Sequence, residues 1–447
     1  MAFAYEVELY NKSGQLLEIL TNDLAEAPQW RYDAVGGCGE CVIKLRRDFD
    51  DFGDIGLDYD IQIHEVVDVN YRADTLADSQ FDLTIGESIF GGTVGESTGS
   101  PLPATLPFAL LGVKVLRYSG FIREIRPLLA NSEVVTLFVS GYSRQLEYIS
   151  VTKKTPPYGV VNYASLDCGE IARQIIDTYV LPGSRILRTA GAGLCQDTGV
   201  VVSADGLNFN GSAFEALKTL ADIGGNAEFG VSASKEIFFT PRSQVVKQTW
   251  MIGDKVLDLE PSRGSADEIV HTVYLEGGDV GGSPFRAVLN IAPVENNYFK
   301  ERVVVVPSII NAGDATLWGV SYASRFASAK TRGRITIAAI DTELSGLSPW
   351  IERQPNQVMP PLGLFRVVGG PTFLRAGAAL PLQLPAQLSA ASVGGTTDLS
   401  FRPHSITYTP INGGLQIQID LGERTNALWD YQRAIEYQLS ALRQRAA

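Results

Sequence analysis

The chain has 447 residues, 45% of them hydrophobic, and a formal net charge of −13. At roughly 150 residues per domain this length predicts about three domains, and the apolar content is enough for packed cores. An acidic surface argues against a protein that grips DNA or an anionic membrane, because lysine and arginine make those contacts. We therefore expect no specific nucleic-acid binding.

The N-terminus, MAFAYEVELY, has neither the basic region nor the apolar stretch of a secretory signal. No window reaches the roughly 18 consecutive apolar residues of a membrane helix. We expect a protein that is synthesised in a host cytoplasm and has no stable membrane insertion. Its four cysteines are too few for a disulfide-stapled scaffold of this length.

Residues 1–150 have the pattern of a β domain. The segments YEVELY, IQIHEVVDV and VVTLFVSGY alternate apolar and polar residues, which predicts strands with one solvated face. Turn residues separate them, so we predict a tube-like antiparallel β domain of barrel or sandwich type. Residues 72–115 are rich in Gly, Ser, Thr and Pro and predict a long loop between two strands.

Residues 151–245 predict an α+β middle domain. The segment SLDCGEIARQIIDTYVLPG places apolar residues at helical spacing and ends at Pro-Gly. A second helix should begin after an N-cap at Ser212, with Glu215 three residues on, and end at Gly224. The segment AEFGVSASKEIFFTPR then predicts a hairpin.

Residues 246–447 return to strands, including EIVHTVYLEGG, ERVVVVP and GRITIAAI, and predict a second tube-like β domain. One helix, at about residues 316–331, interrupts them, and residues 369–397 predict another loop. The chain should close with a helix from Ala427, capped by Asn426. The predicted fold class is mainly β, with two tube-like antiparallel β-barrel domains, a helix-containing middle domain and a C-terminal helix.

The two β regions share a sequence pattern. FIREIRPLLANSEVVTLFVSGY and SITYTPINGGLQIQIDLGER both describe a hairpin with a proline near its turn, followed by Gly-x-x-Arg or Gly-Glu-Arg. The similarity is weak and gapped, and it suggests a duplicated β module.

The pair Cys38-x-x-Cys41 is the one candidate metal site. A structural zinc or iron–sulfur site needs four ligands, usually as two close pairs, and Cys168 and Cys195 lie in another predicted domain. The x-x spacing puts the first two thiols on opposite faces of an extended strand. We interpret them as unliganded thiols, and an iron–sulfur or zinc site or a disulfide stays open as an alternative.

Other motifs are better explained without chemistry. Gly95-Glu96-Ser97-Thr98-Gly99 matches a nucleophile elbow, but the prolines that follow forbid the helix which that motif requires. His64-Glu65-x-x-Asp68 hints at a zinc protease, yet its surroundings are strand-like and not helical. The acidic run DFDDFGDIGLDYD only touches a calcium-loop pattern. We predict no catalytic residues and no bound cofactor.

The order of several segments resembles a known family. GGCGECVIKLRRDF with LDYDIQIHEV, then YSGFIREIRPLL, then SAFEALKTLADIGGNAEFGVSASKEIFFTPR and finally LQIQIDLGER follow one another along the chain. This succession resembles the tail hub proteins of tailed bacteriophages, which have the baseplate-hub fold. The thiols at Cys38 and Cys41 depart from the usual residues there, which keeps the cluster alternative open.

The resemblance implies a non-enzymatic homotrimer at the tail tip of a virion. Each subunit would give two tube-like domains to a ring that continues or closes the tail tube and passes DNA during ejection. Its partners would be the tail tube or distal tail protein and a tip or fibre protein. Because DNA carries a charge about every 1.7 Å of its axis, an acidic channel wall would repel it and limit friction. We therefore expect a net negative channel face.

Two other functions remain open from the sequence. A tail-associated cell-wall hydrolase would need a carboxylate pair or a zinc centre. A multi-domain glycan-binding adhesin would have exposed aromatic residues on an outer loop and would be monomeric.

Overall fold

The computed structural model describes most of the strands and helices that were expected from the sequence. The described residues are 4–46, 55–68, 112–127, 134–154, 159–189, 194–242, 246–251, 256–263, 269–294, 299–327, 331–340, 364–368, 392–393, 396–401, 403–411 and 414–421. Strands dominate them, so the mainly-β prediction is confirmed.

The N-terminal β unit is one curled sheet with the strand order β3-β4-β7-β6-β5-β1-β2. Its strands are β1 (Ala4–Tyr10), β2 (Leu16–Ile19), β3 (Gln29–Asp33), β4 (Val35–Arg46), β5 (Asp60–Asp68), β6 (Gly112–Pro127) and β7 (Val134–Gly141). Side chains from both ends of this order, such as Trp30 on β3 and Leu9 on β1, lie in the same hydrophobic cluster. The sheet therefore wraps around its own core, as a barrel-like module does.

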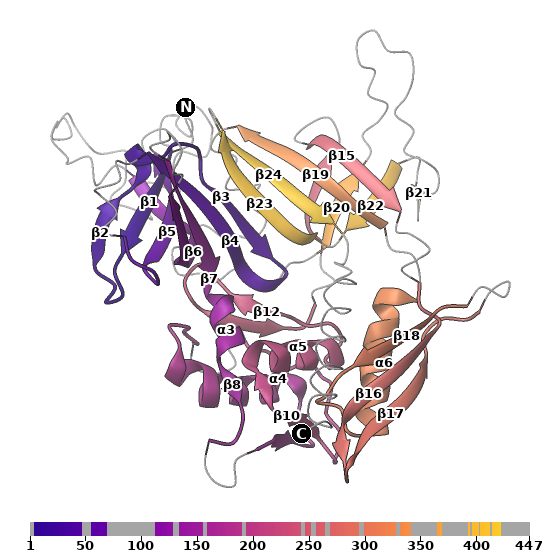
Figure 1. The fold of residues 1–447 in the computed structure, drawn as a ribbon. Helices are drawn as coiled ribbons and strands as arrows, with labels where there is room; N and C mark the ends of the chain where they lie inside the picture. Colours follow the sequence, from indigo (N-terminus) through magenta and orange to yellow (C-terminus); the bar gives the residue numbers. More distant parts are fainter. Residues whose placement is uncertain are drawn as a thin grey trace, which may run out of the picture.

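The C-terminal β unit continues the same sheet in the order β15-β19-β24-β23, and β23 pairs with β3. These strands are β15 (Val256–Arg263), β19 (Thr331–Ile340), β23 (Pro403–Ile411) and β24 (Gly414–Leu421). A smaller sheet contains β14 (Val246–Met251), β20 (Leu364–Val368), β22 (Thr396–Phe401) and β21 (Ser392–Val393). In Figure 1 the yellow strands β23 and β24 lie directly beside the indigo strands β3 and β4.

The strand order repeats between the two units. Four strands of each unit follow the same order: β3, β4, β6 and β7 are arranged as β3-β4-β7-β6, and β15, β19, β23 and β24 are arranged as β15-β19-β24-β23. The central row matches as well, because Leu137 pairs with Ile43 and Ile125 while Ile419 pairs with Ile335 and Ile406. This common order supports the duplication that the two hairpin sequences suggested.

The middle of the chain forms a helical layer below the first unit (Figure 1). Helix α4 (Cys168–Ile175) is capped by the Asp167 side chain and continues as a π-helix, Ile176–Val180. Helix α5 (Ala213–Ile223) begins where predicted, because the Ser212 hydroxyl accepts a bond from the Glu215 N–H at 3.2 Å. The predicted hairpin is β12 (Glu228–Val231) and β13 (Ile237–Thr240).

A three-stranded sheet packs on the same helical layer. It has the order β17-β16-β18 and consists of β16 (Thr272–Val280), β17 (Ser283–Asn290) and β18 (Glu301–Val305). Its inner face and helix α6 (Ala312–Phe326) share one hydrophobic cluster with α4 and α5. The sequence predicted that the middle domain ends at residue 245. In the structure, apolar side chains between Val270 and Phe326 also pack in the middle cluster.

Several predicted boundaries shift in the structure. Helix α6 begins four residues earlier than expected, because the Asn311 side chain caps it at the Asp314 N–H, 2.8 Å away. Strand β6 already begins at Gly112, inside the predicted loop 72–115, and β21 and β22 occupy the end of the predicted loop 369–397. The rest of both loops and the predicted terminal helix from Ala427 lie outside the described residues.

Candidate assembly surface

The two β units are joined edge to edge. Strand β23 pairs antiparallel with β3, and Ile406 lies opposite Tyr32 while Thr407 lies opposite Arg31. Both Ile406 and Tyr32 are buried in the cluster that also forms the core of the first unit. The junction therefore has a ladder of backbone hydrogen bonds and a continuous apolar core, which makes the two units one packed body.

The face of this sheet away from the core is polar, and its charges are paired. The pairs within the described part are Arg31–Asp33 at 2.7 Å, Arg334–Asp420 at 3.2 Å, Arg126–Glu124 at 2.5 Å, Lys44–Glu26 at 2.8 Å and Arg123–Glu40 at 4.0 Å. Uncharged side chains such as Thr407, Gln416 and Gln418 alternate with buried neighbours on β23 and β24. On β1 of the same sheet, Glu6 and Glu8 share one cation, Lys114.

The middle domain is attached to the first unit by strand addition. Strand β12 pairs in parallel with the start of β4, and Gly230 lies opposite Gly36. A Cβ atom at Gly37 would lie 2.2 Å from the Val231 carbonyl oxygen, and one at Gly230 would lie 2.3 Å from the Gly37 nitrogen. Only glycine permits two backbones to approach this closely. The Gly-rich start of β4 is therefore explained by packing against another backbone.

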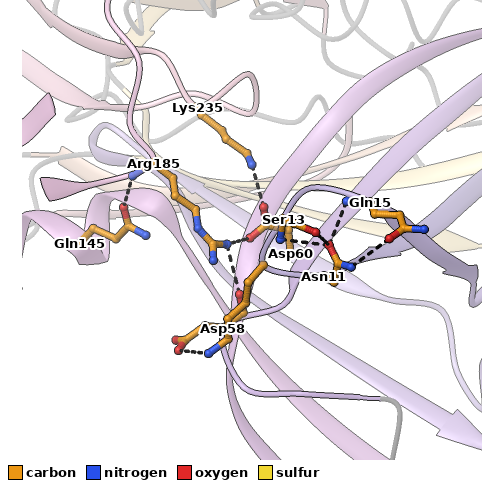
Figure 2. A network of polar contacts seen from close by, with 9 residues as sticks. Asn11, Ser13, Gln15, Asp58, Asp60, Gln145, Arg185 and Lys235 are labelled. Atoms are coloured by element: carbon orange, nitrogen blue, oxygen red, sulfur yellow. Dashed lines mark hydrogen bonds and ion pairs between the residues drawn. The ribbon is translucent and has the colours of Figure 1, made fainter. Parts of the chain in front are cut away.

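A buried carboxylate reinforces this attachment (Figure 2). Asp60, on β5 of the first unit, is 3% exposed. Its Oδ2 accepts a bond from the Lys235 ammonium at 2.7 Å, and its Oδ1 contacts the Arg185 guanidinium. Both cations belong to the middle domain, and Gln145 holds the Arg185 N–H at 3.0 Å. Asp60 is therefore neutralised by two cations that only the folded domain junction brings together.

Cys38 and Cys41 both lie in the core of the first unit. The expectation that they face opposite sides of a strand is wrong, because β4 contains a bulge. Trp30 and Tyr32, two residues apart on β3, pair with Cys41 and Cys38, which are three residues apart. The extra residue reverses the alternation, so both thiols point into one hydrophobic cluster.

The surroundings of the thiols do not resemble a metal site. Burial raises the pKa of Cys38 to about 12 and raises that of Cys41 as well, so both stay protonated at neutral pH. Metal ligation requires thiolates. Among the described residues no group of three or more metal-ligating side chains comes together, and Cys168 and Cys195 are buried in the other cluster. We therefore keep the interpretation of Cys38 and Cys41 as unliganded thiols, with an iron–sulfur or zinc site at this pair as the alternative.

His64 is placed in a polar cluster on β1, β5 and β6. Its Nε2 lies 3.1 Å from a Glu8 oxygen, and Lys114 donates to Glu8 at 3.0 Å and to Glu6. Burial lowers the pKa of His64, and the Glu8 carboxylate offsets this only in part. Burial opposes ionisation of Glu8, but bonds from Tyr10 and Lys114 lower its pKa overall. The cluster thus holds a neutral imidazole beside a paired carboxylate.

Of the other sequence motifs, the end of the acidic run forms ion pairs, because Asp58 pairs with Lys12 at 3.2 Å and Asp60 with Arg185 and Lys235. The segment Gly95–Gly99 and Asp48 and Asp50 of the acidic run lie outside the described residues. His271 accepts a bond from the Lys300 N–H at 3.0 Å. No described helix has the length and apolar character needed to cross a membrane.

An apolar row crosses the outer face of the three-stranded sheet. Val288, Tyr274 and Val303 lie directly opposite one another on β17, β16 and β18. They are 63%, 39% and 52% exposed. The ion pair Arg286–Glu276 borders the row at 3.3 Å. Apolar side chains with a charged rim are typical of protein–protein contact sites. The sequence pattern showed strands here but could not show which face α6 would cover.

Known proteins resemble this chain in structure and not in sequence. No protein-family profile and no curated protein matches the sequence. The 43 kDa tail protein of prophage MuSo2 from Shewanella oneidensis aligns over 94% of this chain and 98% of its own, with 12% identity and a TM-score of 0.50. A tail protein from Neisseria meningitidis aligns over 94% and 97%, with 10% identity and a TM-score of 0.48. By the first of these likenesses, the resemblance stated from the sequence is confirmed for the fold: this chain has the fold of a phage tail protein.

Proposed function

We propose that the chain is a structural, non-enzymatic hub at the distal end of a phage tail, and that three copies form a ring around a channel. The observation that carries this proposal is the single sheet built from two units, each of which contains four strands in the same order. One face of that sheet covers the core, so in a ring the opposite face would line the channel. Three copies would then present six equivalent units to a six-fold tail tube.

The face that would line the channel carries ion pairs among its described residues, whereas the net charge led us to expect an acidic lining. Its cations and carboxylates are paired, as in Arg31–Asp33 and Arg334–Asp420. An arginine that already pairs with a carboxylate attracts a phosphate less strongly, because the two opposite charges are close together and their fields largely cancel at distances larger than the pair itself. We propose that a charge-paired polar wall, and not a repulsive one, lets DNA pass with little retention.

The apolar row Val288–Tyr274–Val303 is the described surface that best suits the anchoring of a tip or fibre protein. It lies on the three-stranded sheet, apart from the continuous sheet that would form the ring (Figure 1). Charged substitution of Val288 would then abolish capture of the adjacent tail protein and leave the mass of the ring unchanged. Loss of the ring itself would contradict this division of surfaces.

Three of the buried acids that the structure describes serve packing. Asp60 is bound by two cations, Glu65 pairs with Arg117, and Asp314 accepts a bond from the Ser203 hydroxyl at 2.8 Å. Each has a structural partner, which favours a scaffold over the hydrolase alternative. A peptidoglycan-clearing assay with the purified chain tests this, and turnover that is lost on substitution of one carboxylate would overturn it.

The proposal as a whole is tested by mass photometry and negative-stain imaging of the full chain. We expect a particle of about three times the 48.4 kDa of one chain, with a central hole. A monomer at micromolar concentration would favour the adhesin alternative and would count against the ring.

A further inference from the structure

We propose that neighbouring copies join through the outer edge of β6 in one chain and the outer edge of β15 in the next. This inference rests on the proposed ring and names the contact that would build it. The argument comes from the strand order, which repeats between the two units of one chain.

The junction between the two β units of one chain shows which strand edges pair. In the second unit, the edge of β23 opposite β24 is occupied by β3, the first strand of the other unit. The strand equivalent to β23 in the first unit is the second half of β6, and the strand equivalent to β3 in the second unit is β15. If the same contact is repeated, β6 of one copy must pair with β15 of another.

Both required edges are open among the described strands. Strand β6 pairs with β5 only up to Phe121 and with β7 from Gly120 to Pro127. On the side of β6 that faces β5, the last described backbone hydrogen bond along the strand is at Ile122, whose N–H donates to the Tyr59 carbonyl at 2.9 Å. Beyond it, residues 123–127 have no described strand on that side. Strand β15 pairs on one side only, with β19.

The register follows from the internal junction. Leu137 and Ile419 occupy equivalent places, which makes Ile125 equivalent to Ile406 and Arg126 equivalent to Thr407. By the same pairing scheme, the β15 equivalents of Tyr32 and Arg31 are Arg263 and Ser262.

Two residue pairs are then expected across the contact. Ile125 faces Arg263, and Arg126 faces Ser262 on the next copy. The following pair is Pro127 with Pro261, and the ladder ends there because proline donates no bond.

Such a contact joins two different surfaces, so copies follow one another head to tail. They form a ring only if the rotation from each copy to the next adds up to a full circle. The rival edge is β2, the other end of the sheet, whose Leu16, Leu17 and Ile19 are exposed. We favour β6 because the repeat prescribes it, and the experiment includes β2 as a competitor.

The test is disulfide trapping in the full chain. The variant Arg126→Cys with Ser262→Cys should form covalent species on mild oxidation that end at the trimer on a non-reducing gel. The variant Arg31→Cys with Thr407→Cys copies the same geometry inside one chain and should give an intrachain disulfide at monomer size. The four native cysteines are buried and should not interfere.

Mixing the two single variants separates the possible contacts. Arg126→Cys mixed with Ser262→Cys should give disulfide-linked dimers, and each alone should give none. Leu17→Cys with Ser262→Cys should not cross-link.

Three outcomes would overturn the inference. A trimer by mass that fails to cross-link at Arg126 and Ser262, while the internal control oxidises, would show that the ring uses other edges. Cross-linking of Leu17→Cys with Ser262→Cys instead would identify β2 as the contact. A monomer by mass would remove the proposed ring itself, together with this contact.

Discussion

Trp30 and Tyr408, which come from opposite ends of the chain, stack with ring centroids 5.7 Å apart and planes 11° apart. They sit opposite each other on β3 and β23, at the junction of the two β units. Both are buried in the shared core. This contact ties the stability of each unit to the other.

The first prediction is that the two β units unfold together. Trp30→Ala should cost about 3–5 kcal/mol, because it removes a large buried aromatic side chain, and calorimetry should show one lowered transition for both units. Tyr408→Phe keeps the stacked ring and serves as the control. Two separate transitions, of which Trp30→Ala moves only one, would contradict a shared core.

The second prediction concerns the glycine contact between β4 and β12. Gly37→Ala should destabilise the protein far more than Gly14→Ala, as measured by urea unfolding. Both glycines have a positive φ, +77° and +80°, so the backbone penalty of about 1–2 kcal/mol is matched. Only at Gly37 would the added Cβ meet another backbone, at 2.2 Å, whereas Gly14 has open space. Equal losses would show that the close approach does not constrain β4.

The third prediction is that Asp60→Ala loosens the middle domain from the first unit. Removing the buried carboxylate leaves two cations without their partner, and loss of one member of such a group costs about 3–5 kcal/mol. Glu26→Ala, which breaks the exposed pair with Lys44, should cost less than about 1 kcal/mol. Limited proteolysis and urea unfolding measure both effects. Similar small losses in the two variants would show that Asp60 does not hold the domains together.

The fourth prediction is a loss of stability at alkaline pH. Burial raises the pKa of Cys38 to about 12, from an ordinary value near 9. The stabilising contribution of the neutral thiol is therefore complete below pH 9 and declines as the pH rises from 9 towards 12, since the unfolded chain ionises first. At pH 10 one such thiol costs about 1.4 kcal/mol.

Cys38→Ala should reduce this pH dependence. Urea unfolding between about pH 8 and 10.5 measures it, because a thiol of the unfolded chain ionises roughly within this interval. In the native protein at pH 8 the thiols should not react with a thiol reagent, and they should react after unfolding. Rapid native labelling, or zinc or iron found by elemental analysis, would overturn the interpretation of Cys38 and Cys41 as idle core residues.

The fifth prediction tests the charge-paired wall. Asp33→Asn with Glu124→Gln frees Arg31 and Arg126 on one face of the sheet, so DNA affinity should appear at low salt and fall steeply as salt is added. Asp177→Asn with Asp197→Asn frees two arginines in the middle domain and should bind DNA more weakly. Equal binding by the two variants would argue that the sheet face has no special access to DNA.

Local patterns decided the secondary structure and the fold class. Alternating residues in YEVELY produced β1, and Ser212 with Glu215 set the start of α5, because period and capping act within a few residues. The resemblance of the successive segments to phage tail proteins likewise followed from residue order and is confirmed for the fold.

Only the tertiary structure decided how the elements meet. A bulge, invisible in the spacing of Cys38 and Cys41, turned both thiols into one core. The pairing of β23 with β3 and the two cations around Asp60 join segments far apart in the chain. Such contacts depend on the global packing of apolar faces and on where buried charges find partners, and neither is written in any local stretch of sequence.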